Sequence, residues 1–374
     1  MRTGKLAEAA LKRSVFRQLN TTLPDGSSRY GADCCVVPIE TGSKSALSET
    51  GSKSALSEAG SKSALSEAGS KSVLSEAGSK SILSGTGSKM ALTAIGKVPG
   101  FEDRPEYLVT AAMNNLVVGG AVPTGVMIHA MLPPSYEEAD LKEDMKSIAK
   151  AAEANGIAVL GGHTEVTDAV LRPIYQMTGV GIAQEAENCA AALLQPGQAL
   201  VMTKWIALAG TAALAYRYEE ELGKRFPFTL IDRAKEFEKL MSVAQEARAI
   251  THFGVCAMHD LSQGGIFGAL WEMAERAGVG LEVDLKKIPV KQETVEICEF
   301  FDVNPYNLYS AGALLAGSWQ PEVLVSKLHE QGIPAAVIGY VTDKNDRIIR
   351  NGEDVRFLDR PQQEEWYRKF GGSL

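Results

Sequence analysis

The stretch Ile157-Ala-Val-Leu-Gly-Gly-His-Thr-Glu-Val-Thr167 joins a short apolar run to a glycine pair and three polar side chains. The four apolar residues Ile157–Leu160 predict a short buried strand. Gly161–Gly162 predict a sharp turn after it, because glycine adopts backbone conformations that other residues avoid. The polar residues His163–Glu165 would then stand at the carboxyl end of the strand, where α/β folds present groups to ligands. An ordinary tight turn is the alternative interpretation.

The composition of the 374-residue chain is that of a soluble globular protein with room for two domains. The formal net charge is −8. Nucleic acids and anionic membranes select basic surfaces, so this charge argues against both as partners. The first twenty residues lack the apolar core of a signal peptide, and no apolar run approaches the length of a membrane span. No Cys-x-x-Cys pair is present, and we therefore expect a reduced, cytoplasmic protein.

A nine-residue repeat interrupts the chain at residues 42–89. Copies that begin Gly-Ser-Lys start at Gly42, Gly51, Gly60, Gly69, Gly78 and, in degraded form, Gly87. One leucine in each full copy buries too little surface to offset the entropy of ordering the backbone, and the Gly/Ser content is typical of flexible linkers. We predict a mobile insertion, with a stacked solenoid as the alternative. Gly-Ser-Lys-Ser does not match a P-loop, in which the lysine follows the glycine directly.

Hydrophobic periodicity outside the repeats predicts an α+β protein. The clearest expected helix is Ala139–Asn155, with Leu141, Met145 and Ile148 on one face. Other helices are expected at Lys5–Leu19, Pro105–Gly120, Phe228–Ala249, Ile266–Ala277, Thr294–Phe301 and Glu322–Gln331. Strands are expected within Gly31–Ile39 and at Val126–Leu132, Tyr175–Ile182, Ala199–Thr203, Val255–Met258, Leu281–Asp284, Ala313–Leu315 and Ala335–Val341. The polar stretch Glu185–Gly197 predicts a domain boundary.

Six segments of the chain carry a resemblance to a known family. They are Gly31–Val37, Asn114–Ala121, Gly161–Thr167, Lys204–Thr211, His259–Gly265 and Asn304–Leu315. In order and spacing they resemble the aminoimidazole ribonucleotide (AIR) synthase superfamily, which includes HypE, selenophosphate synthetase and thiamine-monophosphate kinase. The likeness is closest to HypE-like, AIR-synthase-related proteins, and it covers nearly the whole chain outside the repeats.

The resemblance implies an α+β protein of two AIR-synthase-like domains. Residues 1–41 and 90–184 would form the N-terminal ATP-binding domain, whose sheets pair as a barrel in a homodimer. Residues 185–350 would form a C-terminal α/β sandwich domain, followed by a tail at 351–374. The resemblance also implies ATP and Mg²⁺ near the dimer interface and transfer of the γ-phosphate to a small-molecule substrate. A maturation-protein partner is left open. HypE acts through a carboxyl-terminal cysteine, whereas the last cysteine here is Cys298, so its own chemistry is not expected.

The resemblance also implies several aspartates that hold magnesium against the ATP phosphates. Only one of these aspartates is present in this chain. Asp33, in Gly-Ala-Asp-Cys-Cys, matches the first motif. The second, a Thr-Asp-Pro-like turn after a strand, should lie at Leu92–Val98, which contains no carboxylate. The third, Asn-Asp on a helix, is Asn114-Asn115 here. Magnesium prefers carboxylate oxygens, so these losses weaken the expected site. A turn-capping carboxylate is the alternative role for Asp33.

The Gly-Gly-His-Thr-Glu-Val-Thr stretch matches the related proteins residue for residue. In a nucleotide site, Gly161 and Gly162 would let the backbone approach the ligand, and Thr164 would bind a phosphate oxygen. Glu165 would reach the metal or the substrate, and His163 would act as an acid–base group near neutral pH. The alternative for His163 is a turn histidine that hydrogen-bonds backbone carbonyls.

Further phosphate contacts are expected in the second domain. Asp260 ends a predicted strand, and Gly264-Gly265 open a helix whose unpaired amides would suit a phosphate. Lys204 would supply another contact. Loop capping is the alternative for Asp260, and simple solvation is the alternative for Lys204.

Two hypotheses of function follow. In the first, the protein is an ATP-dependent phosphoryl transferase or ligase-like activator, with Asp33, His163, Glu165 and Asp260 around the nucleotide. In the second, it is a degenerate relative that keeps the dimeric fold and binds a nucleotide or metabolite without turning it over. The resemblance favours the first hypothesis, and the missing aspartates favour the second.

Overall fold

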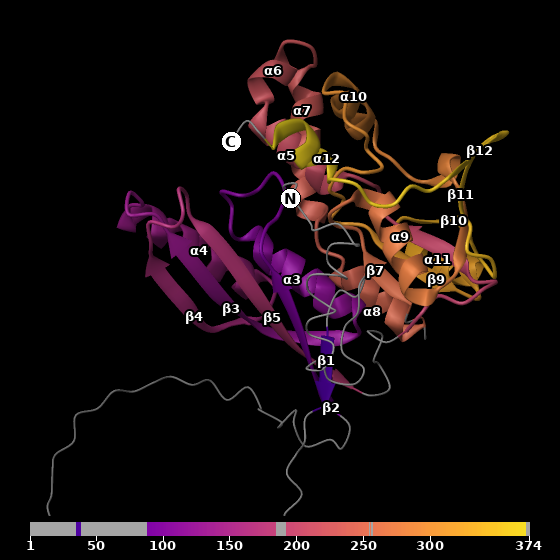
Figure 1. Cartoon of the computed structure of the whole chain (residues 1–374), viewed down its shortest axis with the longest axis horizontal. Helices are drawn as coiled ribbons and strands as arrows, with labels where there is room; N and C mark the ends of the chain where they lie inside the picture. The colour runs from indigo at the N-terminus through magenta and orange to yellow at the C-terminus, as the bar shows by residue number, and fades with distance from the viewer. Residues whose placement is uncertain (1–34, 39–87, 185–191, 254, 256, 372–374) are drawn as a thin grey trace, which may run out of the picture.

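We describe residues 35–38, 88–184, 192–253, 255 and 257–371 of a computed structural model of the chain. The expected helix at Lys5–Leu19, Asp33 and residues 42–87 of the repeat segment lie outside the described residues. Mixed sheets and helices form two units that follow one another in the chain (Figure 1). The α+β prediction is therefore confirmed.

The N-terminal unit is a five-stranded mixed sheet with helices on one face (Figure 1). Its strand order is β1-β2-β5-β3-β4; β3 and β4 run parallel, and the other neighbours are antiparallel. The strands are β1 Cys35–Pro38, β2 Ser88–Ile95, β3 Ala121–Leu132, β4 Ala158–Val166 and β5 Ile174–Gln184. Helices α3 (Tyr107–Val118) and α4 (Glu138–Ala154) bury their apolar residues, such as Leu116 and Ile148. The opposite face exposes side chains such as His129, and we call it the open face.

The C-terminal unit is a seven-stranded sheet in the order β12-β11-β8-β10-β6-β9-β7. Its strands are β6 Ala199–Thr203, β7 Met258–Asp260, β8 Gly280–Asp284, β9 Leu314–Ser318, β10 Ala335–Thr342, β11 Arg347–Asn351 and β12 Asp354–Phe357. Helix α9 (Gly265–Ala277) packs with one side of this sheet, and α8 (Ala244–His252) and α11 (Pro321–Glu330) pack with the other. The remaining helices are α5 Leu208–Arg217, α6 Glu219–Gly223, α7 Phe228–Lys235, η4 Glu236–Leu240, η5 Leu285–Lys287, α10 Gln292–Phe300 and α12 Glu365–Phe370.

One hydrophobic core joins the two units. It contains Leu108 of α3 and Ile148 of α4 from the first unit, together with Leu214 of α5 and Trp366 of α12 from the second. Trp366 has no exposed surface, and its ring lies close to Gly100 in the loop before α3. The two sheets are therefore held by shared apolar burial, which is the largest favourable contribution to folding.

The helix expected over Phe228–Ala249 is broken into α7, η4 and α8. The break lies at residues 241–243, whose backbone groups bond to side chains from other elements. Asn114 binds the carbonyl of residue 241 and the amide of residue 243, and Lys204 donates to the carbonyls of residues 240 and 242. A continuous helix would need these groups for its own i to i+4 bonds, so tertiary contacts override the local periodicity.

The turn predicted at the glycine pair is wrong, because β4 continues through it to Val166. The prediction that Ile157–Leu160 form a buried strand is also wrong, because every residue of β4 from Ala158 onward is exposed. A register shift of the β3–β4 pairing occurs just before Gly161, with Val126 opposite Val159 and Met127 opposite Gly161. A Cβ atom at Gly162 would lie 1.8 Å from the carbonyl oxygen of Ile128. The glycine pair therefore allows a bulge and a close approach to β3, and does not end the strand.

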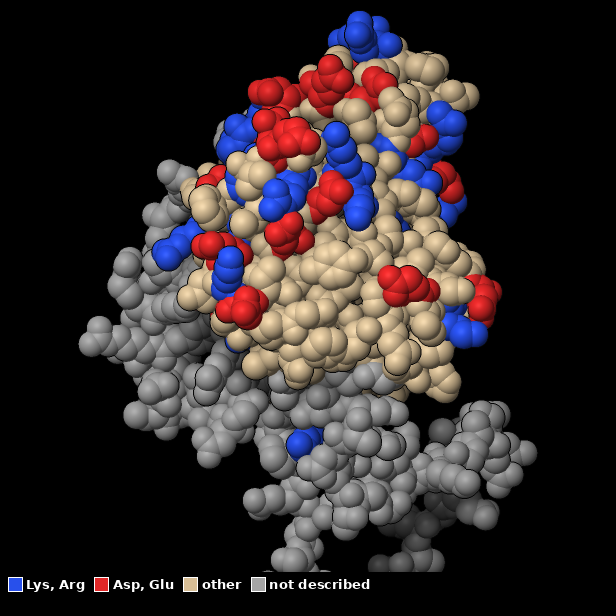
Figure 2. All heavy atoms as spheres, turned by 90° about the vertical axis from the view of Figure 1, so that its right-hand side faces the viewer, with Lys and Arg blue, Asp and Glu red and all other residues tan. Residues whose placement is uncertain are grey.

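The segment expected as a tail is folded at least as far as Gly371. It contains β12 and α12, which the sequence patterns did not predict. On the face of the molecule shown in Figure 2, Lys and Arg side chains alternate with Asp and Glu over the upper half, and the middle is broadly uncharged. Within the described ranges, no helix combines the length and the apolar character that a membrane crossing requires.

Candidate functional site

His163 and Glu165 lie side by side on the open face of β4. Residues two apart on a strand point to the same side, and His163 Nε2 lies 3.3 Å from Glu165 Oε2. The two side chains are 67% and 49% exposed. On the adjacent strand β3, His129 pairs directly with His163, and on β5 Gln176 pairs with His129. The open face thus carries two imidazoles and a carboxylate that are accessible to a ligand.

His129 was not predicted from the sequence. No local motif surrounds it, and its position next to His163 follows only from the parallel pairing of β3 with β4. Thr164 alternates with His163 and Glu165 and therefore points to the other side of β4, opposite Ala130. The three polar residues of the motif consequently do not face one ligand together.

Asn115 contacts strand β2 within the segment where the second family motif was expected. Its Nδ2 donates to Thr93 Oγ1 at 2.9 Å. Residues up to Ile95 belong to strand β2, so the turn expected at Leu92–Val98 does not begin before Gly96. On the other side of β2, Cys35 pairs with Leu92. Two of the motifs that the resemblance assigns to the nucleotide therefore come together here, and Asp33 lies outside the described residues.

Asn114 has a structural role instead of the cofactor contact predicted for it. The side chain has no exposed surface. Its Nδ2 donates to the Met241 carbonyl at 2.8 Å, and its Oδ1 accepts from the Val243 amide at 3.0 Å. Asn114 therefore ties α3 of the first unit to the η4–α8 connection of the second.

Lys204 is neither a phosphate contact nor a solvated surface residue. Its Nζ lies 2.6 Å from Glu246 Oε1 and donates to the carbonyls of Leu240 and Ser242 at 2.8 and 2.7 Å. The side chain is 8% exposed. Burial lowers the pKa of Lys204 below its ordinary value, and the Glu246 carboxylate acts in the opposite direction. We call Asn114, Lys204, Glu246 and residues 238–243 the interdomain junction.

Asp260 and the start of α9 are more enclosed than predicted. Asp260 is 2% exposed, and its neighbour His259 lies 3.2 Å from Glu272 Oε2 in the protein interior. The amide of Gly265 donates to Ser262 O, and that of Phe267 donates to Tyr306 O. The unpaired amides expected at Gly264-Gly265 are therefore already used in part. A Cβ at Gly265 would lie 2.4 Å from Tyr306 O, so this glycine permits close packing.

Those predicted site residues that the structure describes do not gather around one point within a single chain. Strand β4 lies at one edge of the first sheet, whereas β7 with Asp260 lies in the second unit (Figure 1). Strands β5 and β3 separate β2 from β4, a distance of roughly 14 Å at the usual strand spacing. Within the described part of the chain, no group of three His, Cys, Asp or Glu side chains is arranged to hold a metal ion. These residues alone therefore do not fit magnesium.

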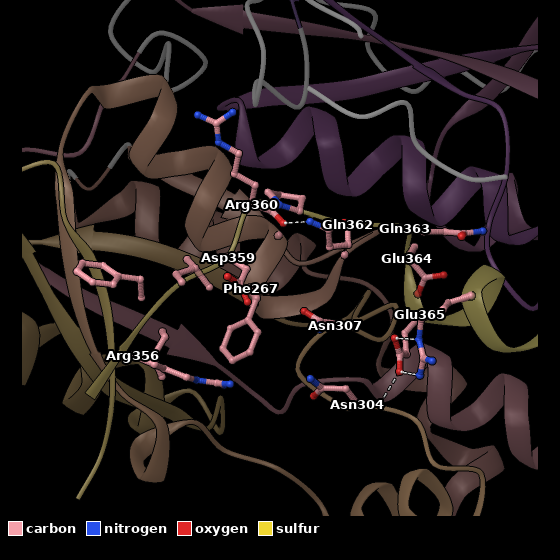
Figure 3. A pocket seen from close by; sticks show the side chains of 17 residues that line it. Phe267, Asn304, Asn307, Arg356, Asp359, Arg360, Gln362, Gln363, Glu364 and Glu365 are labelled. Atoms are coloured by element: carbon pink, nitrogen blue, oxygen red, sulfur yellow. Dashed lines mark hydrogen bonds and ion pairs between the residues drawn. The ribbon is translucent and has the colours of Figure 1, made fainter. Parts of the chain in front are cut away.

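A cavity of about 360 Å³ lies beside the start of α9 (Figure 3). Gly264 contributes to its lining, but most of the lining side chains come from loop residues after α10 and from the segment between β12 and α12. Of the lining residues, the sequence analysis named Gly264 as a phosphate contact and included Asn304 and Asn307 in a segment that resembles the family, but it did not single out the residues after position 350.

Two family models match the chain. Residues 105–183 match the N-terminal domain of AIR synthase related proteins, and residues 195–350 match the C-terminal domain. A putative hydrogenase expression/formation protein of Methanocaldococcus jannaschii is 27% identical over 246 residues, which is 64% of this chain and 71% of that protein. The carbamoyl dehydratase HypE of Rhodobacter capsulatus is 26% identical over 248 residues, with 65% and 71% of the two chains covered.

Solved structures show the same fold. The crystal structure of E. coli HypE has a TM-score of 0.64 at 22% identity and covers 74% of this chain and 86% of its own. HypE in complex with ATP has a TM-score of 0.58 at 18% identity, with coverages of 75% and 87%. AaThiL complexed with AMPPCP and TMP has a TM-score of 0.63 at 16% identity, with coverages of 96% and 98%.

Proposed function

Because this chain belongs to the AIR synthase related protein family, we propose that it is an ATP-dependent enzyme that transfers a phosphoryl group to a small-molecule substrate and so activates it. The complexes of relatives with ATP and with AMPPCP and TMP support a nucleotide as the ligand. The hydrogenase-maturation relatives make a maturation-protein partner a further prediction.

The observation that carries the proposal is the contact between Thr93 and Asn115. It joins β2 to α3 where two nucleotide motifs of the family fall, and Cys35 pairs with the residue next to Thr93. Asp33 precedes Cys35 by two positions in the sequence, and the proposal assigns Asp33 to this site. Since Thr93 and Asn115 are neutral, a magnesium ion would depend on Asp33 and Glu165. When bound, such an ion neutralises phosphate charge.

The proposal includes a homodimer, because the acid–base residues lie at the far edge of the sheet from Asn115. All nine residues of the edge strand β4 are exposed, including Val159, Leu160 and Val166. An uncovered strand of this kind is a pairing surface. A twofold axis that sets β4 of one copy beside the β1–β2 edge of the other would place His163 and Glu165 near that edge of the second copy. The proposal is that they act there on the substrate of the second copy.

In this arrangement His163 moves a proton at the substrate oxygen, and Glu165 serves as a ligand of the metal. A histidine is suited to this role near neutral pH. The bond that forms joins the substrate oxygen to the γ-phosphorus, and the bond that breaks joins the γ-phosphorus to the β,γ-bridging oxygen, so that ADP leaves.

A non-catalytic nucleotide-binding dimer is the second candidate. It is favoured by one observation, that the pair facing the expected nucleotide site is the neutral Thr93–Asn115 pair and not an aspartate. Both candidates predict nucleotide binding, but only the first predicts turnover.

Thermal shift and ATP turnover separate the two candidates. ATP with magnesium should raise the melting temperature of the wild type, because a ligand that binds only the native state stabilises it. For an enzyme, His163→Ala should lower turnover at least about 100-fold, the usual contribution of an acid–base group, and His252→Ala, on the exposed end of α8, should leave it unchanged. Binding without turnover would support the second candidate, and no nucleotide-dependent shift would refute both.

A further inference from the structure

One wall of the cavity beside α9 consists of residues that lie outside the range matched by the family's domain models. One side is formed by Gly264, Phe267 and Gly268, and the other by residues 356–365 (Figure 3). The match to the AIR synthase related C-terminal domain ends at residue 350. A volume of about 360 Å³ is within the range of small-molecule pockets. The second wall therefore comes from residues beyond the matched domain.

The acidic side chains at one end of the cavity are already engaged. Glu365 accepts from Arg368 Nε at 2.8 Å and from the Asn304 amide at 2.9 Å. Glu364 accepts from the Tyr309 amide at 2.9 Å. Burial raises the pKa of Glu364 to about 8, so this carboxyl is mostly protonated at neutral pH. Neither group contributes a free negative charge to the cavity.

Arg356 and Arg360 are the two lining cations that have no ion pair with a carboxylate among the described residues. Figure 3 shows the Arg360 side chain pointing away from Phe267 and Asn304, so Arg356 is the cation directed at this part of the cavity. It lies on β12, with its guanidinium carbon 5.5 Å from the centroid of the Phe267 ring. Among the described residues no carboxylate forms an ion pair with Arg356; Asp359 also lines the cavity, and Figure 3 shows it on the other side of Phe267. An arginine left unpaired at a pocket is suited to phosphate or carboxylate, whose oxygens match its fork of donors.

A second donor faces Arg356 across the cavity. Asn304 Oδ1 accepts from the Tyr306 amide at 3.0 Å, which leaves the NH₂ end of the side chain for another partner. Figure 3 shows this end and the Arg356 guanidinium pointing toward one another, with Asn307 beside them. Two donors that face each other across a gap are complementary to an acceptor group placed between them. The face of Phe267, which stacks on Tyr306, supplies an apolar surface next to that position.

We propose that this cavity binds a small organic anion, whose phosphate or carboxylate group lies between Arg356 and Asn304 and whose apolar part lies against Phe267. The site is separate from the nucleotide site proposed above, because it uses neither β2 nor β4. It gives the segment after residue 350 a binding role in addition to its packing through Trp366.

Isothermal titration with inorganic pyrophosphate and with citrate tests the site and distinguishes the two anionic groups. Arg356→Gln should weaken binding of the preferred probe at least about tenfold, the effect of one charged hydrogen bond. Asn304→Asp keeps the acceptor for the Tyr306 amide but replaces the NH₂ donor with a charged oxygen, so it should abolish binding. The matched control is Arg350→Gln, whose arginine pairs with Glu282 on β8 and does not line the cavity.

Binding of either probe at millimolar concentration, lost in both cavity variants and retained in the control, would establish the site. The preferred probe would identify the group as phosphate or carboxylate. If the wild type binds neither probe, or if Arg356→Gln and Asn304→Asp bind as the wild type does, the proposal is wrong. A failure of nucleotide turnover would not affect this test, since Arg356 and Asn304 line the cavity and lie on neither β2 nor β4.

Discussion

The interdomain junction and the open face of β4 both contain residues predicted to belong to the nucleotide site, Asn114 and Lys204 as cofactor contacts and His163 and Glu165 as catalytic residues, but their surroundings differ. Asn114 and Lys204 in the junction are buried, and each bonds to two or more protein groups. His163 and Glu165 on β4 are largely exposed, and among the described residues their side chains make a polar contact only with each other. Buried polar groups that hydrogen-bond to several other protein groups stabilise the fold. Exposed polar groups with few protein partners remain available to a ligand.

The largest effect should follow from removing the cation of the junction. Lys204→Met leaves Glu246 buried without its ion pair, which should lower the free energy of unfolding by about 3–5 kcal/mol. Urea denaturation measures this change, and Lys224→Met, at the exposed position that follows α6, is the control. A loss below about 1 kcal/mol, the value of a surface ion pair, would show that the junction is not the scaffold described here.

A smaller effect is expected from pH. The pKa of Glu364 is raised by burial from 4.5 to about 8, so the folded state favours the neutral carboxyl. Its contribution to stability is therefore complete below pH 4.5 and is lost as the pH rises through 8. Between pH 5 and 9 the wild type should lose roughly 2–4 kcal/mol through this group, and Glu364→Gln should remove that part of the pH dependence. Equal pH profiles of the two proteins would contradict the assignment.

The elements predicted correctly are those that the hydrophobic pattern of their own residues is sufficient to specify. Strand β6 forms at Ala199–Thr203 as predicted, and α4 begins and ends within one residue of the predicted helix. The missed elements depend on distant partners: β12 is exposed along its length, and α12 is only six residues long. The burial of Trp366 in α12 arises from the core shared by both units, which no local period reveals.

Prediction of the candidate site has the same limit, because local sequence does not reveal contacts between distant segments. The motif containing His163 and Glu165 could be found from the sequence, because it matches the related proteins residue for residue. Its strand conformation, which places both residues on one side of β4, could not be found, since the glycine pair predicted a turn. Lys204 could not be interpreted correctly, since Glu246 becomes its partner only when α8 packs beside the end of β6. The proximity of His129 to His163 and the anion cavity at Arg356 also depend on pairings between distant segments.

If β4 is a dimer surface, a charge placed on it should separate the copies. Light scattering at micromolar concentration should give a dimer for the wild type and a monomer for Leu160→Asp, because a buried unpaired carboxylate opposes association. Leu160 is 53% exposed in one chain. Val323→Asp on α11, at 52% exposure, is the matched control and should remain dimeric. A monomeric wild type would refute the dimer.

The smallest effect concerns magnesium. Asn115→Asp adds a negative oxygen beside Thr93 and should strengthen magnesium-dependent ATP binding by roughly three- to tenfold, whereas Asp33→Asn should weaken it. Calorimetric titration of ATP with and without magnesium measures both. Unchanged affinity in both variants would place the nucleotide elsewhere.

A mixing experiment tests most directly whether His163 of one copy serves the nucleotide site of the other. His163→Ala and Asp33→Asn should each have little ATP turnover alone. If the site is shared, a hybrid dimer has one site with both changes and one intact site, so an equal mixture should recover about a quarter of wild-type turnover. If His163 and Asp33 instead belong to one site within a single chain, each site of the hybrid dimer carries one of the two substitutions and turnover is not recovered. Hybrid dimers without recovered turnover would therefore contradict the account.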